Sequence, residues 1–554
     1  MLPIGHGCVT VSRVPSSRNG RRRLSWHVLV CALGALTLAA CGGGGGGSPQ
    51  PQPQPQPQPS SNGWVSGSFL PAASYAAQCA VPRTGTDSST GLPYPDVKGS
   101  VLTENNWLRS WSNDTYLWYD EIPDLDPGLY GTTAAYFGLL KTTATTASGQ
   151  PKDRFHFTYD TAQWRALSQS GVSAGYGVEW AVVANLPPRR IVVAYVQADP
   201  ALAAGLQRGD VVQTVDGVDV VNSNTQSAVD VFVAGLYPDQ PGTTHTFNIL
   251  SPLTGVVRTV TMQAQNVTSL PVQNVKTIVT STGGVGYLQF NDHLATAEDA
   301  LATAFETLRQ SSIDDLVIDM RYNGGGLLAI ASELAYMIAG DARTAGQTFE
   351  QEQFNAKHTS IDPVTGNPLT PFPFQSTTLG FSRPAGSPLP TLNLSRVFVL
   401  TGPSTCSASE AVINSLRGVN VEVIQIGSAT CGKPYGYYPT DNCGTTYFTI
   451  QMKGVNAVGF GDYADGFAPN NATASGGTRV PGCSVADDFL NALGSPVEAR
   501  LAAALAYRTG AICPTPSGFA PLGFGEPSER ASPTSVDGIV LKPLWLQNRV
   551  LSVR

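Results

Sequence analysis

Residues 403–418, "PSTCSASEAVINSLRG", bring several serines to the start of a predicted helix. Ser407 and Glu410 fit the S-x-x-E capping box, in which the serine accepts a hydrogen bond from a helix amide and the glutamate reaches back. A serine here could also be a nucleophile, because the amide of Ala408 and the positive end of the helix dipole would stabilise an oxyanion. The stretch alone favours the capping role.

A lysine follows the next predicted strand, residues 421–426. The segment "GSATCGK" leads from that strand to Lys433. An ordinary lysine, with a pKa of about 10.4, is a poor base at neutral pH. Burial penalises the charged amine, so a buried Lys433 would have a lowered pKa and could accept the proton of a serine. Its neighbours Cys431, Gly432 and Pro434 are uncharged, which suits a buried amine.

A glycine-rich turn follows a third predicted strand, residues 316–320. Gly324, Gly325 and Gly326 lie between that strand and a predicted helix from Leu327. Glycines at such a turn let backbone amides point into open space, as an oxyanion site requires. A phosphate-binding loop would also use glycines, but the Lys-Ser/Thr pair of that motif is absent here.

These three positions must be brought together by a sheet. From residue 284 onward, predicted strands and helices alternate, which indicates a βαβα core around a mostly parallel sheet. Reactive groups in such sheets gather beyond the carboxyl ends of the strands. The glycine turn, Ser407 and Lys433 each follow such an end, so we expect them to meet.

Two smaller parts precede this core. Around residues 101–165 we expect a small helical domain, in which Trp107, Trp111 and Trp118 fall near helical spacing. An aromatic stripe of this kind usually belongs to a hydrophobic core. Residues 171–265 consist of short β-rich runs broken by Gly and Asp turns. The fold class is therefore a mixed α/β multidomain protein.

The β-rich part contains a phrase, "AGLQRGDVVQTVDGVDV", that closely resembles the second half of a PDZ domain of the bacterial protease type. The loop "GYGV" would then offer the backbone amides of Tyr176, Gly177 and Val178 to the terminal carboxylate of a peptide. The peptide itself would add to the sheet as an extra strand. The alternative is a degenerate PDZ domain that only packs.

Taken in order, the PDZ-like region, "VIDMRYNGGG", "TCSASE" and "GSATCGKP" resemble the carboxyl-terminal processing peptidases, also called tail-specific proteases. The resemblance extends to "DGFAPN" and "LGSPVEARLAAALAYRTG" and covers about residues 100–510. It implies a ClpP/crotonase-like core in which Ser407 is the nucleophile and Lys433 its general base. The amide of Ala408 and one from Gly325 or Gly326 would bind the oxyanion. No metal, nucleotide or other cofactor is implied.

One position departs from the family pattern. Many members carry a glutamine four residues after the lysine, where it orients the amine, and this chain has Tyr437 there. A phenol can donate a hydrogen bond to an amine or accept one, so Tyr437 is the candidate third member of the site. A Ser-His-Asp triad that uses His293 or His358 is a rival arrangement, although no G-x-S-x-G motif supports it.

Six cysteines follow Cys41, and an even number in an oxidising compartment suggests disulfides. Their pairing stays open, because six cysteines allow 15 combinations. A bridge between Cys406 and Cys431 would draw two strand ends together, either as a structural bond or as a redox switch. Free buried thiols are the remaining option.

The N-terminus predicts export. Arg21, Arg22 and Arg23 precede an apolar run that ends at Cys41 and is too short to span a bilayer as a mature helix. Residues 38–41 resemble the bacterial lipobox, which implies cleavage before Cys41 and lipidation of its thiol. An ordinary signal peptide is the alternative. The Gly-rich and Pro-Gln segment that follows suits a spacer. We expect a lipid anchor on the periplasmic face, at the outer membrane more than the inner one.

The chain has 554 residues, a formal net charge of −7 and only 13% charged residues, so it lacks the basic surface of a nucleic-acid-binding protein. Its length suits several domains. We expect a signal peptide (1–40), a linker (41–66), a helical domain (67–165), a PDZ domain (166–266), a peptidase core (267–512) and a C-terminal tail (513–554).

These features predict a serine endopeptidase with a Ser407/Lys433 dyad, whose partners are proteins with apolar C-terminal tails captured by the PDZ domain. The alternative is an inactive lipoprotein on the same scaffold that binds peptides or apolar ligands. The tail after about residue 515 could dock in the protein's own groove, be trimmed, or serve as a surface strap.

Overall fold

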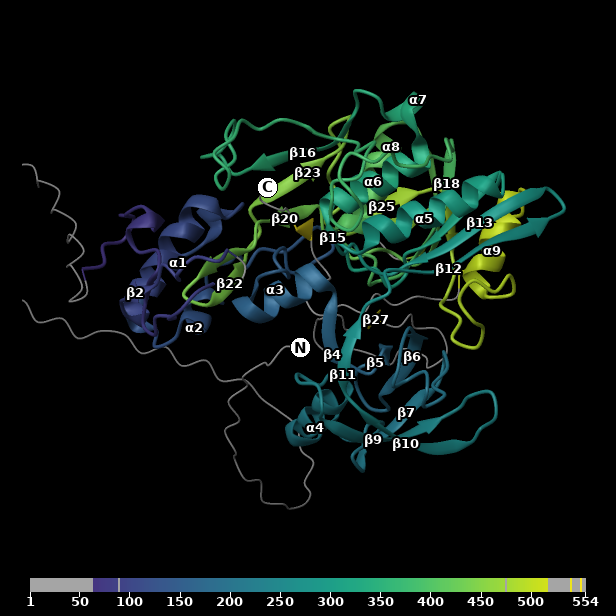
Figure 1. The fold of residues 1–554 in the computed structure, drawn as a ribbon, viewed down its shortest axis with the longest axis horizontal. Helices are drawn as coiled ribbons and strands as arrows, with labels where there is room; N and C mark the ends of the chain where they lie inside the picture. The colour runs from purple at the N-terminus through teal and green to yellow at the C-terminus, as the bar shows by residue number, and fades with distance from the viewer. Residues whose placement is uncertain (1–62, 88–89, 474–475, 517–538, 541–548, 551–554) are drawn as a thin grey trace, which may run out of the picture. The chain divides into compact units, whose positions relative to one another are not determined.

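The computed structural model describes residues 63–87, 90–473, 476–516, 539–540 and 549–550. The predicted signal peptide, Cys41 and nearly all of the predicted linker therefore lie outside the described residues. Within the described ranges, no helix is long and apolar enough to cross a membrane. The fold is mixed α/β, as the sequence predicts (Figure 1).

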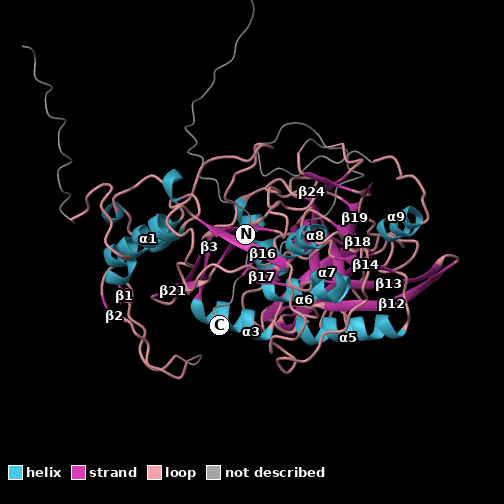
Figure 2. Cartoon of the chain, turned by 90° about the horizontal axis from the view of Figure 1, so that it is seen from above, coloured by secondary structure: helices cyan, strands magenta, loops and turns pink. Residues whose placement is uncertain are grey.

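A six-stranded sheet forms the centre of the peptidase part. Its strands, in spatial order, are β12 (Val272–Thr280), β13 (Gly283–Phe290), β14 (Asp315–Asp319), β18 (Arg396–Thr401), β19 (Glu422–Gly427) and β26 (Gly482–Ser484). Figure 2 labels the first five of them. β12 and β13 are antiparallel, and all other neighbours in this sheet are parallel. The prediction of a mostly parallel sheet is thus confirmed.

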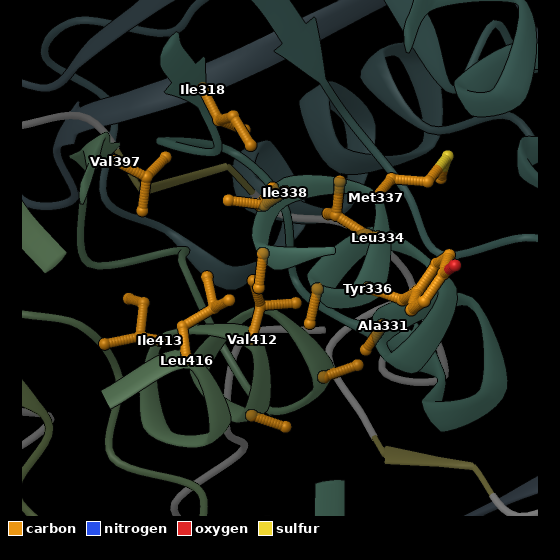
Figure 3. Packing of buried hydrophobic residues seen from close by; sticks show 14 of the residues in the cluster. Ile318, Ala331, Leu334, Tyr336, Met337, Ile338, Val397, Val412, Ile413 and Leu416 are labelled. Carbon is orange, nitrogen blue, oxygen red and sulfur yellow. The ribbon is translucent and has the colours of Figure 1, made fainter. Parts of the chain in front are cut away.

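Helices cover both faces of this sheet, because its side chains alternate between the two sides. The helices are α5 (Ala297–Gln310), α6 (Leu328–Ala339) and α8 (Ala408–Gly418) on one face and α9 (Ala499–Arg508) on the other. Ile318 and Val397 of the sheet pack in one cluster with Ile338 of α6 and Val412 of α8 (Figure 3). α8 is buried along almost its whole length, which holds its first turn inside the protein.

A second sheet lies beside the first and contributes to the site described below. Its order is β15 (Gly326–Leu327), β28 (Arg549–Val550), β20 (Tyr435–Tyr437), β23 (Met452–Val455), β16 (Thr348–Phe354) and β17 (Phe372–Pro373). The short helix α7 (Asp341–Thr344) precedes β16, and β24 (Phe467–Pro469) pairs with β25 (Thr478–Val480).

The N-terminal part contains β1 (Gln78–Cys79), β2 (Val97–Lys98), α1 (Val101–Thr115), α2 (Thr133–Phe137), β3 (Phe157–Asp160) and α3 (Thr161–Ser170). Trp107 and Trp111 stack on α1 with ring centroids 5.2 Å apart. Trp118 does not continue this stripe, because α1 ends at Thr115 and the Trp118 ring packs on Tyr435 of the peptidase part.

This N-terminal part is joined closely to the peptidase part. β3 forms a three-stranded sheet with β22 (Thr445–Phe448) and β21 (Thr440–Asn442). A disulfide connects Cys79 to Cys443, and Phe157 stacks on Phe448 at 4.4 Å. Through these contacts, the segment predicted as residues 67–165 contributes aromatic side chains to a cluster that it shares with the peptidase part.

The small β-domain, residues 172–268, contains β4 (Val172–Gly175), β5 (Val178–Ala184), β6 (Arg190–Val196), β7 (Val211–Val215), β8 (Val218–Asp219), α4 (Gln226–Leu236), β9 (Thr244–Leu250), β10 (Val257–Gln263) and β11 (Gln265–Thr268). Its main sheet runs in the order β10, β9, β7, β6, β5, and β27 (Ile539–Val540) adds to β5. Trp180, Phe232 and Phe247 belong to a hydrophobic cluster of its own.

Candidate active site

Three strand ends of the central sheet meet at one edge. β14, β18 and β19 are parallel neighbours, with Asp319 opposite Leu400 and Thr401 opposite Gly427. The chain leaves β14 toward the glycine turn, β18 toward Ser407 and β19 toward Lys433. The sheet therefore brings the three sequence motifs to the same place.

Ser407 precedes α8 in a conformation unlike that of an ordinary N-cap. N-cap residues are usually extended, whereas Ser407 has φ 59° and ψ −110° and is fully buried. A positive φ at a residue other than glycine costs about 1–3 kcal/mol and persists only where the surroundings enforce it. Here the preceding amide, that of Cys406, donates to the Asn323 carbonyl at 3.0 Å. Such strain is typical of a functional serine.

Gly325 packs directly against Ser407. A Cβ atom at Gly325 would lie 2.9 Å from the Ser407 Cβ and 3.0 Å from the Ala408 nitrogen, and the glycine has φ +110°. Only glycine fits this close approach. The Gly325 amide, however, donates to Asn323 Oδ1 at 3.0 Å. Of the two glycines named as oxyanion donors, Gly326 is therefore the better candidate, and Gly325 acts through its lack of a side chain.

Asn323 organises the glycine turn, a role that the sequence analysis missed. Its Oδ1 accepts the Gly325 amide and lies 3.0 Å from His293 Nδ1, while its amide nitrogen donates to the Phe290 carbonyl at 3.0 Å. An asparagine two residues before the turn's second glycine is a recognisable Asx-turn signal.

Lys433 is fully buried beneath two aromatic rings. Its Nζ lies 4.5 Å from the ring centroid of Phe155 and 4.5 Å from that of Tyr437. Phe155 comes from the N-terminal part of the chain, so that part supplies a wall of the lysine site. The lysine thus occupies the apolar surroundings that the sequence analysis expects of a buried base.

Glu410 connects the serine and the lysine. One carboxylate oxygen, Oε2, accepts the backbone amide of Ser407 at 2.9 Å and that of Lys433 at 2.7 Å. The other oxygen accepts the Gly432 amide at 2.8 Å and the Thr430 hydroxyl. Burial raises the pKa of Glu410, whereas these hydrogen bonds lower it. The effect of burial is the larger, so the pKa of Glu410 lies above its ordinary value. The sequence analysis assigned Glu410 to the capping box and missed its hold on the lysine turn.

Tyr437 meets Lys433 through its ring face. Burial raises the pKa of the Tyr437 phenol well above 10. Among the described residues, the Tyr437 hydroxyl has no hydrogen-bond partner. In place of the expected hydrogen bond between phenol and amine, the structure shows a contact between the Tyr437 ring and the Lys433 amine nitrogen.

A disulfide joins the residue before Ser407 to the lysine turn: Cys406 is bonded to Cys431. The carbonyl of Cys431 also accepts a hydrogen bond from Arg154 Nη2 at 2.7 Å. The two sulfur atoms and the Glu410 carboxylate lie within 4.8 Å of one another, a spacing suitable for a metal ion. Cysteine binds a metal ion as a free thiolate, however, and these two sulfurs are bonded to each other. With the disulfide formed, this group does not offer a metal site.

The two rival histidines lie in different surroundings. His293 Nδ1 faces the amide oxygen of Asn323, whereas a triad histidine is oriented by a carboxylate. His358 Nε2 lies 3.0 Å from Asp114 Oδ1 at the end of α1, next to the N-terminal part.

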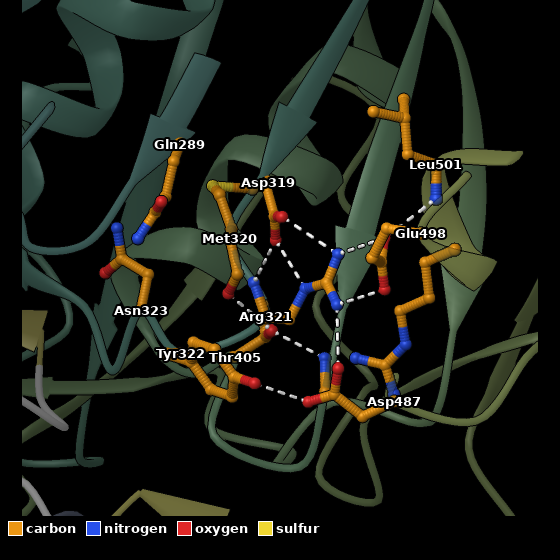
Figure 4. Close-up of polar contacts among 12 residues, drawn as sticks. Gln289, Asp319, Met320, Arg321, Tyr322, Asn323, Thr405, Asp487, Glu498 and Leu501 are labelled. Atoms are coloured by element: carbon orange, nitrogen blue, oxygen red, sulfur yellow. Dashed lines mark hydrogen bonds and ion pairs between the residues drawn. The ribbon is translucent and has the colours of Figure 1, made fainter. Parts of the chain in front are cut away.

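A buried ionic cluster fixes the start of the glycine turn (Figure 4). Arg321 is bonded to Asp319 at 2.9 Å, to Glu498 at 2.7 Å and to Asp487 at 2.7 Å. The next residue, Tyr322, donates to the other oxygen of Asp487 at 2.5 Å. These bonds tie the end of β14 to the segment around α9.

The residues of the predicted peptide loop lie in the small β-domain, and none of them is brought to Ser407. The Tyr176 hydroxyl donates to the Gly235 carbonyl at 2.9 Å, and the Gly177 carbonyl accepts the Gln197 amide at 2.8 Å. Val178 begins β5, the outer strand of the domain's own main sheet. A peptide site here would be separate from the candidate active site.

Comparisons with known proteins identify relatives. Residues 284–442 match the model of peptidase family S41, and residues 103–159 match that of the peptidase S41 N-terminal domain. A carboxyl-terminal-processing protease of Picosynechococcus sp. is 26% identical over 273 residues, which are 49% of this chain and 57% of the relative. One from Synechocystis sp. is 25% identical over 245 residues, 44% and 49% of the two chains. The chain thus spans about half the length of the curated relatives it matches.

The fold also has a solved counterpart. A crystal structure of a candidate S41 protease from Bacteroides fragilis superposes with a TM-score of 0.53 at 24% sequence identity, covering 75% of this chain and 98% of the other. The resemblance inferred from the motifs is confirmed: the chain is related to peptidase family S41, the family of the carboxyl-terminal processing peptidases.

Proposed function

We propose that this protein is a serine endopeptidase in which Ser407 is the nucleophile and Lys433 the general base. The observation that carries the proposal is the position of Glu410, one oxygen of which binds the backbone amides of both residues. The strained backbone of Ser407 and the close approach of Gly325 support the same assignment.

In the proposed reaction, Ser407 Oγ attacks the carbonyl carbon of a peptide bond while its proton passes to the neutral amine of Lys433. The amides of Ala408 and Gly326 donate hydrogen bonds to the oxyanion that forms. The C–N bond then breaks, and the leaving amine takes the proton from Lys433. Lys433 then takes a proton from a water molecule that attacks the ester on Ser407. The ester C–O bond breaks, and the Ser407 oxygen takes the proton back from Lys433, which restores both residues.

The small β-domain would bind the substrate's C-terminal tail. Its outer strand β5 can pair with an extended peptide, and the amides of Tyr176, Gly177 and Val178 lie at the start of that strand. Apolar C-terminal tails of unfolded proteins are the proposed substrates. A lipid anchor at Cys41 would keep the enzyme at the periplasmic face of a membrane.

The test uses the chain from about residue 62, incubated with an unfolded protein that ends in apolar residues. Mass spectrometry would detect the cuts. Cleavage is expected to fall at least about a thousandfold in Ser407→Ala and in Lys433→Ala, because each variant removes one half of the dyad. Ser415→Ala, a buried serine two turns along α8, is the matched control and should cleave normally. Cleavage that survives in Ser407→Ala would refute the assignment.

One observation favours a second candidate, an inactive peptide-binding lipoprotein. Tyr437 stands four residues after Lys433, where the family pattern named in the sequence analysis has a glutamine, and the Tyr437 hydroxyl makes no hydrogen bond to Lys433. If this candidate is right, the protein will bind the tailed substrate without cutting it, and Ser407→Ala will leave the binding unchanged.

A further inference from the structure

A short strand from the C-terminal end of the chain lies in the candidate active site. β28, Arg549–Val550, runs parallel to β15 on one side and parallel to β20 on the other. Arg549 is opposite Gly326 and Gly436, and Val550 is opposite Leu327 and Tyr437. One flanking strand therefore begins at the candidate oxyanion glycine, and the other ends at the tyrosine that covers Lys433.

β28 occupies a slot between two strand edges. β15 and β20 are neighbours of β28 and not of each other, so each would present unpaired backbone groups to the slot without it. Such edges bind extended chain through main-chain hydrogen bonds. The slot is therefore suited to polypeptide of varied sequence, which is what an endopeptidase site requires.

A second strand from the same tail lies on the small β-domain. β27, Ile539–Val540, pairs antiparallel with β5, with Ile539 opposite Val182 and Val540 opposite Ala181 (Figure 1). β5 is the strand that follows the predicted carboxylate-binding loop at Tyr176 and Gly177. One tail thus pairs with the protein at both places where a substrate peptide is expected.

We infer that the protein's own C-terminal tail is a ligand of both peptide sites, bound in the resting enzyme as two short added strands. The inference rests on the proposed function only in naming the ligand class, an extended polypeptide. A substrate that arrives from outside must displace Arg549–Val550 from the slot before it can reach Ser407. Removal of these pairings would open the slot and leave the catalytic residues unchanged.

Binding tests this inference without relying on catalysis. The probe is a fluorescent peptide with the sequence of residues 536–554. The parent protein is the chain from about residue 62 with Ser407→Ala. The opened protein carries Arg549→Pro and Val550→Pro in addition. Proline lacks the amide that a strand donates and disfavours the pairing. By fluorescence anisotropy, the proline variant should bind the probe at least tenfold more tightly, because its slot is open. The control pair Thr534→Pro and Ser535→Pro leaves Ile539–Val540 and Arg549–Val550 unchanged, and it should bind the probe as weakly as the parent.

A second probe that carries proline at the positions of Arg549 and Val550 should bind the opened protein at least tenfold more weakly than the first probe. Ile539→Pro with Val540→Pro in the protein checks the contact with β5 and should give an intermediate gain. Equal affinity of parent and opened protein would overturn the inference, as would proline-insensitive binding of the probe. With Ser407 intact, the opened protein should also cleave faster. If neither form cleaves but the binding results hold, the proposed function fails and the tail ligand stands.

Discussion

At the scale of single residues, Glu410 is the group on which the candidate site depends. Its carboxylate accepts hydrogen bonds from Ser407, Thr430, Gly432 and Lys433, three of them backbone amides. A carboxylate can accept at both oxygens, whereas a glutamine has one oxygen and one NH₂ group. The surroundings of Glu410 therefore favour an acceptor at each of the two oxygen positions, and glutamine has only one.

Glu410→Gln should thus lower both stability and activity. The new NH₂ group would face amide donors, which leaves one or two buried donors unsatisfied and costs about 2–3 kcal/mol. We expect a fall of at least tenfold in kcat, measured with a fluorogenic peptide, and a lower Tm by calorimetry. Glu306→Gln, a partly exposed glutamate on α5 paired with Arg383, is the control and should change neither quantity measurably.

The pH dependence of stability gives a second measurement on Glu410. Burial raises its pKa above the ordinary value of 4.5, so the folded protein holds the proton more tightly than the unfolded chain does. The stability from this group is fully present below pH 4.5 and is lost as the pH rises through the raised pKa. In chemical denaturation, Glu410→Gln should lack this part of the pH slope. Identical slopes in both proteins would show that Glu410 is not the titrating group.

Tyr437 offers a separate test, because its ring and its hydroxyl have different surroundings. The ring contacts Lys433 Nζ, whereas the hydroxyl is buried with no hydrogen-bond partner among the described residues. Tyr437→Phe should therefore keep kcat within about twofold and leave Tm equal or higher. Tyr437→Ala should lower kcat at least tenfold, since it opens a cavity beside the amine. A large loss in Tyr437→Phe would instead indicate that the hydroxyl orients Lys433.

At the scale of elements, the bond between Cys406 and Cys431 joins the loops after β18 and β19. It closes a loop with a sequence separation of 25, which the chain-entropy model values at about 3.5 kcal/mol. The bond between Cys483 and Cys513 has a separation of 30 and lies near β26 and α9, so it is a close control. Each cysteine pair can be replaced by alanines without changing the other.

We expect both alanine pairs to lower Tm by similar amounts, because the closed loops are similar in length. Only the Cys406→Ala, Cys431→Ala pair should also lower kcat, by roughly tenfold, because it frees the residue before Ser407 and the turn before Lys433. The measurement is kcat at a temperature where all variants are folded. Equal kcat in the two pairs would mean that the bridge supports the fold without positioning the proposed dyad.

The elements also separate what the sequence could predict from what it could not. The alternation of parallel strands with helices and the three motifs at strand ends were predictable, since hydrophobic runs and glycine turns are local signals. The bond between the Gly325 amide and Asn323 lies within one turn and could also have been predicted, from the asparagine two residues before that glycine. The hold of Glu410 on Lys433 could not, because it joins α8 to the loop after β19. The same holds for β27 and β28, two-residue strands without a periodic pattern of their own.

At the scale of the whole molecule, one arginine connects the small β-domain to the peptidase part. The Arg208 guanidinium donates to the Tyr322 hydroxyl at 2.8 Å and to Asp487 Oδ1 at 2.7 Å, and Tyr195 stacks on Tyr322 at 5.9 Å. Tyr322 directly precedes Asn323, which holds the glycine turn. The position of the small β-domain and the shape of the candidate oxyanion site are thus linked through two adjacent residues.

Arg208→Ala should therefore reduce both stability and turnover. Truncation leaves the buried Asp487 with one fewer cation, a change that costs about 3–5 kcal/mol where a buried pair is broken. The control is Arg258→Ala, which removes an ion pair with Asp210 inside the small β-domain; because the Arg258 side chain is 33% exposed, this variant should lose less stability than Arg208→Ala.

The informative readout for Arg208→Ala is the division of its effect between kcat and KM. If the arginine only stabilises the fold, kcat per folded molecule will equal that of the parent at low temperature. If it holds Tyr322 and the glycine turn in place, kcat will fall at least tenfold while affinity for a peptide bound by the small β-domain stays the same. The contacts on Tyr322 lead us to expect the second result, and a change confined to Tm would refute the link between the domain and the site.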